Sequence, residues 1–166
     1  MIKDKEKIIN KTKEIIEDNK LLYLSLFGSH LYGTNNLNSD VDIRGIYLPT
    51  KKALYLDNIK HEINFSTGIE HCKNNSNDID IKLFSIQKFL KLSKLGDTNA
   101  LDLFFSYTYP ETILYEDKLI YEFLYNVDKI LDIKDMKAYY SYCIRQAQKY
   151  GIKGSRLGVI RQIKDW

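Results

Sequence analysis

The sequence predicts an α+β fold, with a small mixed sheet flanked by helices and followed by a helical C-terminal part. Apolar runs of strand length, bounded by turn residues, occupy much of the segment 21–84. Apolar residues at helical spacing dominate from residue 85 onward and also mark the N-terminal segment. Strands and helices do not alternate regularly, which excludes a doubly wound sheet.

The N-terminal half is expected to contain one helix and four strands. Isoleucines at roughly helical spacing among lysines and glutamates predict an amphipathic helix over residues 2–18. A short apolar run that ends at Gly28 predicts a buried strand over residues 21–27. Three further strands are expected, at 41–48, 59–65 and 79–84.

The rest of the chain is expected to be mostly helical. Ser85 is a candidate N-cap, because its hydroxyl can accept a hydrogen bond from a backbone N–H of the first helical turn. Later helices are expected at 101–105, 119–125, 136–150 and 155–163.

Composition excludes several classes of protein. The formal net charge is +3, from 25 basic and 22 acidic residues, which is too balanced to indicate a nucleic-acid partner by itself. Cys72 and Cys143 lie far apart without neighbouring histidines, so neither a zinc site nor a disulfide framework is indicated. No apolar run resembles a signal peptide or approaches the ~20 residues of a membrane span. A cytoplasmic protein with no membrane partner is expected.

Carboxylates are the first candidates for chemistry. Asp40 and Asp42 stand at positions i and i+2 where the second strand is expected to begin, so their side chains should share one face. Phosphoryl transfer depends on metal ions that neutralise phosphate charge, and Mg²⁺ prefers oxygen ligands. Asp80 is the candidate third ligand, because an acid between two isoleucines is costly to bury unless it is paired or metal-bound. Asp78 would lie on the same strand face and is the alternative third ligand.

Glycine and basic residues are the candidates for phosphate binding. Gly28 lets backbone N–H groups approach a triphosphate, and the Ser29 hydroxyl can donate a further hydrogen bond. Lys149, Lys153 and Arg156 surround two glycines near an expected helix start, where they would clamp the triphosphate.

Each interpretation has a plainer alternative. Asp40 and Asp42 would also suit a solvated turn, and Asp80 an exposed position on an edge strand. Ser29 would also cap a short helix, and the three C-terminal basic residues would also suit a solvated helix face. Arg44 is expected to pair with a carboxylate. The three histidines, at 30, 61 and 71, are interpreted as surface or structural residues.

Three short blocks together resemble the DNA polymerase β nucleotidyltransferase superfamily. They are Phe27-Gly28-Ser29, the stretch 39–45 that contains Asp40 and Asp42, and Ile79-Asp80-Ile81. Within that superfamily, four longer stretches resemble the RNA repair pathway polymerase β family, whose members are predicted nucleotidyltransferases. These stretches are 28–34, 39–45, 80–89 and 146–157.

The resemblance implies a polymerase-β-like fold and transfer of NMP from an NTP such as ATP to an acceptor hydroxyl, with release of pyrophosphate. It implies that Gly28 and Ser29 bind the nucleotide, and that Asp40, Asp42 and Asp80 bind Mg²⁺, with Mn²⁺ as the alternative ion. An RNA or tRNA end in RNA repair is the expected acceptor.

The resemblance also implies a division of the chain and leaves two other functions open. A catalytic core is expected over residues 1–97 and a helical part that packs on it over 98–166, in a chain that is either truncated or a short member of the family. The first alternative function is nucleotidylation of a protein or small molecule. The second, of a different class, is a non-catalytic nucleotide-sensing or RNA-binding module.

Overall fold

The computed structural model describes most of the chain, in the ranges 5–36, 39–68, 78–125 and 137–150. The strands are β1 (Lys20–Leu26), β2 (Val41–Leu48), β3 (Glu62–Ser66), β4 (Ile79–Ser85) and β5 (Ile113–Glu116). The α-helices are α1 (Lys5–Ile16), α2 (Gly28–Leu31), α3 (Lys51–Tyr55), α4 (Ile86–Lys94), α5 (Thr98–Phe105), α6 (Lys118–Tyr125) and α7 (Lys137–Tyr150). None of the helices in these ranges is long and apolar enough to cross a membrane.

One mixed sheet organises the fold. Its five strands lie in the order β3-β4-β2-β1-β5. β2 and β4 are parallel, whereas β1 pairs antiparallel with β2 and β5, and β3 pairs antiparallel with β4. The expected α+β class with a small mixed sheet is therefore confirmed.

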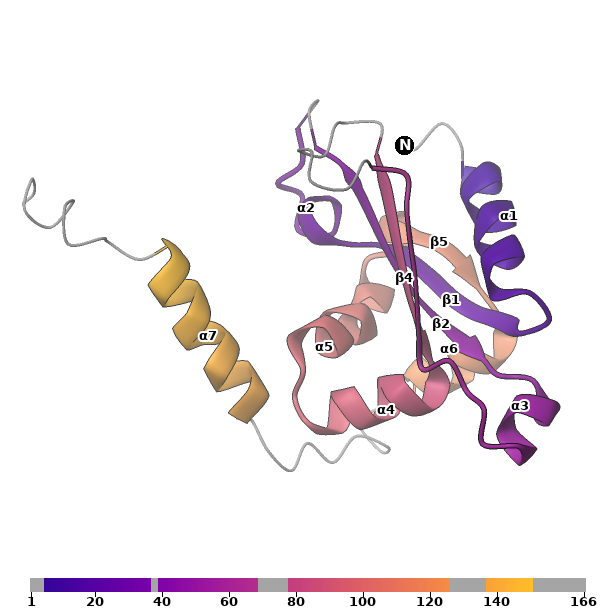
Figure 1. The fold of residues 1–166 in the computed structure, drawn as a ribbon. Helices are drawn as coiled ribbons and strands as arrows, with labels where there is room; N and C mark the ends of the chain where they lie inside the picture. Colours follow the sequence, from indigo (N-terminus) through magenta and orange to yellow (C-terminus); the bar gives the residue numbers. More distant parts are fainter. Residues whose placement is uncertain (1–4, 37–38, 69–77, 126–136, 151–166) are drawn as a thin grey trace, which may run out of the picture.

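Helices cover the sheet on both faces (Figure 1). On one face, Ile8 and Ile16 of α1 pack against alternate residues of the central strands, among them Leu24, Ile43 and Leu83. On the other face, helices α4, α5 and α6 cover a second cluster. Its largest buried side chains include Tyr23, Ile46, Phe84, Phe89, Leu103 and Ile120. In β2 and β4 the two clusters use residues of opposite parity, because side chains alternate along a strand, whereas in β1 a register shift between Leu21 and Tyr23 interrupts the alternation.

Several local predictions can be compared with these elements. The strand 41–48 is confirmed as β2, and Ser85 is confirmed as the N-cap of α4, since its hydroxyl accepts a hydrogen bond from the Lys88 N–H at 3.2 Å. The strand expected from residue 59 begins only at Glu62.

The expectation of a helical remainder is wrong for residues 113–116. These residues form β5, which pairs with β1 at the edge of the sheet. Two hydrogen bonds of buried β1 hydroxyls attach this strand to the segment before β5: Tyr23 Oη lies 2.8 Å from Ser106 Oγ, and Ser25 Oγ donates to Thr112 Oγ1 at 3.1 Å. Buried hydroxyls need hydrogen-bond partners, so these two bonds favour the pairing of β5 with β1.

Candidate active site

The turn after β1 lies directly beside the start of β2. The Phe27 N–H donates to the Asp42 carbonyl at 2.8 Å, which extends the pairing of the two strands by one residue. Gly28 then has a φ of +56°, a left-handed conformation that other residues adopt only at a cost. A β-carbon at position 28 would lie 2.6 Å from Asp42 Oδ2. Both observations require glycine at this position.

Ser29 does not cap a helix, so that alternative is wrong. The helix α2 already begins at Gly28, its N-cap is Phe27, and no side-chain hydrogen bond caps it. Ser29 is half-buried within the helix, and its carbonyl accepts from the Thr34 N–H at 2.9 Å. The hydroxyl of Ser29 is thus not required as a cap in this turn.

Asp42 and Asp80 lie directly opposite each other on the parallel strands β2 and β4. Burial raises the pKa of the Asp42 carboxyl. The nearby charge of Arg44 opposes this rise, while the negative charges of Asp40 and Asp80 add to it. Asp40 and Asp80 therefore lie close enough to Asp42 for their charges to act on its carboxyl.

The edge-strand interpretation of Asp80 is wrong, because β4 lies between β3 and β2 in the interior of the sheet. Its rival Asp78 lies just before β4, where its carbonyl accepts from the Val41 N–H at 3.0 Å. The register of the parallel pair places Asp80, and not Asp78, directly opposite Asp42. Of the two, Asp80 is the carboxylate placed beside Asp42.

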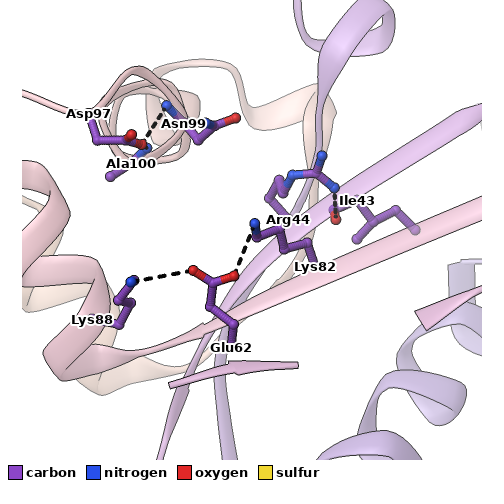
Figure 2. Close-up of polar contacts among 8 residues, drawn as sticks. All are labelled: Ile43, Arg44, Glu62, Lys82, Lys88, Asp97, Asn99 and Ala100. Carbon is purple, nitrogen blue, oxygen red and sulfur yellow. Dashed lines mark hydrogen bonds and ion pairs between the residues drawn. The ribbon is translucent and has the colours of Figure 1, made fainter. Parts of the chain in front are cut away.

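Arg44 contacts the carboxylate cluster, as expected. Its Nη2 lies 3.7 Å from Asp42 Oδ1, and its guanidinium lies over the Phe27 ring at 5.1 Å from the ring centroid. Its Nη1 also donates to the Ile43 carbonyl at 3.2 Å (Figure 2). Burial lowers the pKa of Arg44, and the negative charges of Asp42 and Asp80 oppose this. Three contacts therefore hold the guanidinium beside Asp42.

Cross-strand register arranges the polar side chains of this face in two rows, because paired residues of neighbouring strands share a face. The acidic row runs across β2, β4 and β3 and consists of Asp42, Asp80 and Ser66. The basic row lies two residues along each strand and consists of Arg44, Lys82 and Asn64.

Both rows line an open cavity of about 380 Å³, here called the β3-side cavity. Its remaining lining residues, Phe65 and Ile81, belong to β3 and β4. Sequence reasoning did not identify Lys82, Asn64 or Ser66 as site residues. The signal that could have found Lys82 is its position two residues after Asp80, on the same strand face.

Glu62 joins the basic row to helix α4. Its carboxylate lies 3.1 Å from Lys82 Nζ and 3.5 Å from Lys88 Nζ, as Figure 2 shows. Burial acts to raise the pKa of Glu62, but hydrogen bonds and charges from these two lysines together outweigh it and lower the pKa. Two cations thus share one carboxylate, and only Lys82 of the pair lines the β3-side cavity.

The Asp42 and Asp80 carboxylates offer oxygen ligands that fit a divalent cation, provided that further ligands come from elsewhere. In the part of the chain that the structure describes, no three His, Cys, Asp or Glu side chains are grouped so as to hold a metal ion by themselves. Mg²⁺, however, is usually bound through one or two carboxylates together with substrate phosphates. A cation near Asp42 and Asp80 would also relieve the unfavourable charge that burial and neighbouring acids impose on Asp42.

The remaining residues considered from the sequence are His30 and the three C-terminal basic residues. His30, which is interpreted from the sequence as a surface or structural residue, lies close enough to Asp42 for its charge to lower the Asp42 pKa. His30 Nε2 is buried and has no hydrogen-bond partner among the described residues. Lys149 belongs to α7, but its side chain lies outside the described part of the chain, as do Lys153 and Arg156 entirely.

Two comparisons with known proteins give relatives of this chain. Residues 4–161 match the model of a family described as the RNA repair pathway DNA polymerase beta family. An uncharacterized 38.9 kDa protein from the nrdC-mobD intergenic region of Enterobacteria phage T4 is 36% identical over 145 residues. That alignment covers 87% of this chain but 43% of the phage protein, so the chain spans less than half the length of this relative.

Proposed function

This chain belongs to the RNA repair pathway DNA polymerase beta family, and from that premise we propose that it is a Mg²⁺-dependent nucleotidyltransferase that transfers NMP from an NTP to the hydroxyl of an RNA end. The observation that carries the proposal is the placement of Asp42, which lies opposite Asp80 on the parallel strand and against the backbone of Gly28. A carboxylate pair beside a glycine turn is what a metal-bound triphosphate needs.

Each part of this arrangement has a role in the proposal. Backbone N–H groups at Gly28 and Ser29 would bind the phosphates of the NTP, with the left-handed turn permitting their close approach. Asp40, Asp42 and Asp80 would hold the metal. Bound Mg²⁺ would neutralise the phosphate charge and favour ionisation of the acceptor hydroxyl.

The reaction is an in-line displacement. A bond forms between the acceptor oxygen and the α-phosphorus, while the bond from the α-phosphorus to its leaving oxygen breaks and pyrophosphate departs. We assign Asp80 as the group that takes the hydroxyl proton, because it lines the β3-side cavity from β4, whereas Asp42 is packed against Gly28. Arg44 would keep the Asp42 carboxylate in place through its contact at 3.7 Å.

Transfer of label from each α-³²P-NTP to an RNA oligomer with a free 3′ hydroxyl tests the proposal, with Mg²⁺, with Mn²⁺ and with EDTA. We expect label on the RNA with either metal and none with EDTA. Asp42→Asn should reduce labelling on the order of 10²–10³-fold, because metal binding supplies several kcal/mol of charge stabilisation. Asp57→Asn is the matched control, since Asp57 is exposed and its φ of +50° suits asparagine.

The outcomes test separately whether the protein transfers nucleotides and whether RNA is the acceptor. Label on the protein itself or on a small molecule, but not on RNA, would retain nucleotidyl transfer and reject the RNA acceptor. Absence of label on any acceptor, together with Mg²⁺-NTP binding that Asp42→Asn leaves unchanged, would reject the enzyme and favour a non-catalytic nucleotide-binding module.

A further inference from the structure

The β3-side cavity lies on one side of the carboxylates, and the Gly28 turn lies on the other. Gly28 contacts Asp42 from the end of β1, whereas Asp80, Lys82 and Asn64 line the cavity from β4 and β3. We propose that this cavity is the acceptor subsite and that its basic row binds a phosphate of the acceptor's terminal nucleotide. The proposal rests on the proposed function and names the substrate class of the same site.

The two rows provide different chemistry within one cavity. The acidic row presents Asp42 and Asp80, which would receive a hydroxyl. The basic row presents two cations and an amide, which are donors suited to phosphate oxygens. An acceptor that carries both a hydroxyl and an anionic group can therefore contact both rows at once.

The spacing of the rows selects the kind of acceptor. Residues two apart on a strand are separated by roughly 7 Å. The 3′ hydroxyl and the 5′ phosphate of a single nucleotide span a similar distance. A serine, threonine or tyrosine hydroxyl of a protein has no phosphate at that distance, so the rows favour a nucleotide end over a protein side chain.

The charge at the basic row is suited to an anion. Lys82 pairs with Glu62, but Glu62 is shared with Lys88, so one carboxylate faces two ammonium groups. Arg44 adds a third cation, at the loose distance of 3.7 Å from Asp42. These three cations are offset by Glu62 and by the Asp42 and Asp80 carboxylates, so the basic row favours a phosphate once Mg²⁺ neutralises that carboxylate pair.

Binding of adenosine 5′-monophosphate and of adenosine tests the subsite directly. Each is titrated by calorimetry into the protein saturated with Mg²⁺ and a non-hydrolysable ATP analogue, so that the NTP site is filled. We expect the monophosphate to bind about tenfold more tightly than adenosine, because its phosphate makes charge-assisted hydrogen bonds. Lys82→Gln should remove most of that preference.

Lys88→Gln is the matched control. Lys88 pairs with the same Glu62 carboxylate but does not line the cavity, so its variant should lose clearly less of the preference for the monophosphate than Lys82→Gln. Retained binding of the ATP analogue and an unchanged melting temperature establish that each variant is folded.

Equal binding of the monophosphate and adenosine by the wild type would overturn the subsite, as would equal losses in Lys82→Gln and Lys88→Gln. Failure of the wild type to bind the ATP analogue would instead contradict the proposed function. The same comparison of the two lysine variants, made without the analogue, then decides the phosphate site by itself.

Discussion

Gly28 is packed against the carboxylate of Asp42, so closely that a β-carbon on Gly28 would lie 2.6 Å from Asp42 Oδ2 and 3.4 Å from Cγ. The first distance is far shorter than a van der Waals contact, so any side chain at position 28 must displace the carboxylate. The absence of a side chain at Gly28 therefore allows the Asp42 carboxylate to lie where it does.

The first prediction uses the contrast between Gly28 and Gly33. Both have a left-handed backbone, with φ of +56° and +66°, but a β-carbon on Gly33 would meet nothing within 4 Å. Gly28→Ala and Gly33→Ala should each lower the free energy of unfolding by about 1–2 kcal/mol, the cost of the left-handed conformation. Only Gly28→Ala should also lower nucleotidyl transfer, by on the order of 10²-fold, because it moves Asp42.

Urea denaturation and the RNA-labelling assay measure the two effects separately. Equal activity losses in the two alanine variants would show that backbone strain in the turn, and not the Asp42 contact, controls activity.

The second prediction concerns stability against pH. Burial raises the pKa of Asp42, and this rise persists despite Arg44. The folded state therefore binds this proton more tightly than the unfolded state. The resulting stability is fully present below the usual aspartate pKa, near 4, and is lost as the pH rises through the raised value. Asp42→Asn should thus have a higher melting temperature than the wild type at pH 7, while both should converge near pH 3.

Asp117→Asn provides the control of opposite sign. The Lys20 ammonium, 2.9 Å away, and the Leu119 N–H lower the pKa of Asp117. A lowered pKa contributes stability above the usual aspartate value, and this stability is lost as the pH falls through the lowered one. Asp117→Asn should therefore melt below the wild type at pH 7. Shifts of the same sign in both asparagine variants would contradict the assignment.

The third prediction concerns Gly45, within the stretch 39–45 that contains the acidic pair. A β-carbon there would lie 2.6 Å from the Tyr23 carbonyl oxygen, 2.8 Å from Leu83 Cδ2 and 2.9 Å from Leu24 Cδ1. Gly45→Ala should lower the free energy of unfolding by about 1–3 kcal/mol, the usual cost of overpacking a core. Urea denaturation measures this loss, and a change within about 0.5 kcal/mol, typical of surface substitutions, would show that the strands separate easily.

Local sequence patterns were sufficient to predict the strand that carries Asp42 and the strand face on which Asp80 lies. The alternation of β2 and the acid between two isoleucines are both visible in a few consecutive residues. The choice between Asp78 and Asp80 needed the register of β2 against β4, which depends on pairing between distant segments. The placement of Lys82 and Asn64 in one row likewise depends on the register of β3 against β4, which the sequence does not show.

β5 could not be predicted for a related reason. Its four residues, Ile113–Glu116, are too few to distinguish a strand period from a helical one. What makes them a strand is the pairing with β1, supported by the buried hydrogen bonds of Tyr23 and Ser25. These interactions join residues more than 80 positions apart, so no local window contains them.

The last prediction concerns the hydrogen bond from Tyr32 Oη to Asp102 Oδ2, at 2.5 Å, which joins the turn after α2 to helix α5. Helix α5 is itself held at its start, where Asp97 accepts from the N–H groups of Asn99 and Ala100 (Figure 2). The glycine turn is thereby attached to a well-capped helix. Tyr32→Phe should raise the KM for NTP a few-fold and leave kcat nearly unchanged, because a looser turn weakens binding of the nucleotide ground state and transition state alike.

A double-mutant cycle of Tyr32→Phe with Asp102→Asn separates this bond from other effects of either change. If the bond positions the turn, the two substitutions should be coupled by about 0.5–1.5 kcal/mol in the free energy of unfolding, the usual net worth of a hydrogen bond. The double variant should then bind NTP no more weakly than Tyr32→Phe alone. Independent, additive losses in both measurements would mean that Asp102 and Tyr32 act separately, and that α5 does not position the nucleotide turn.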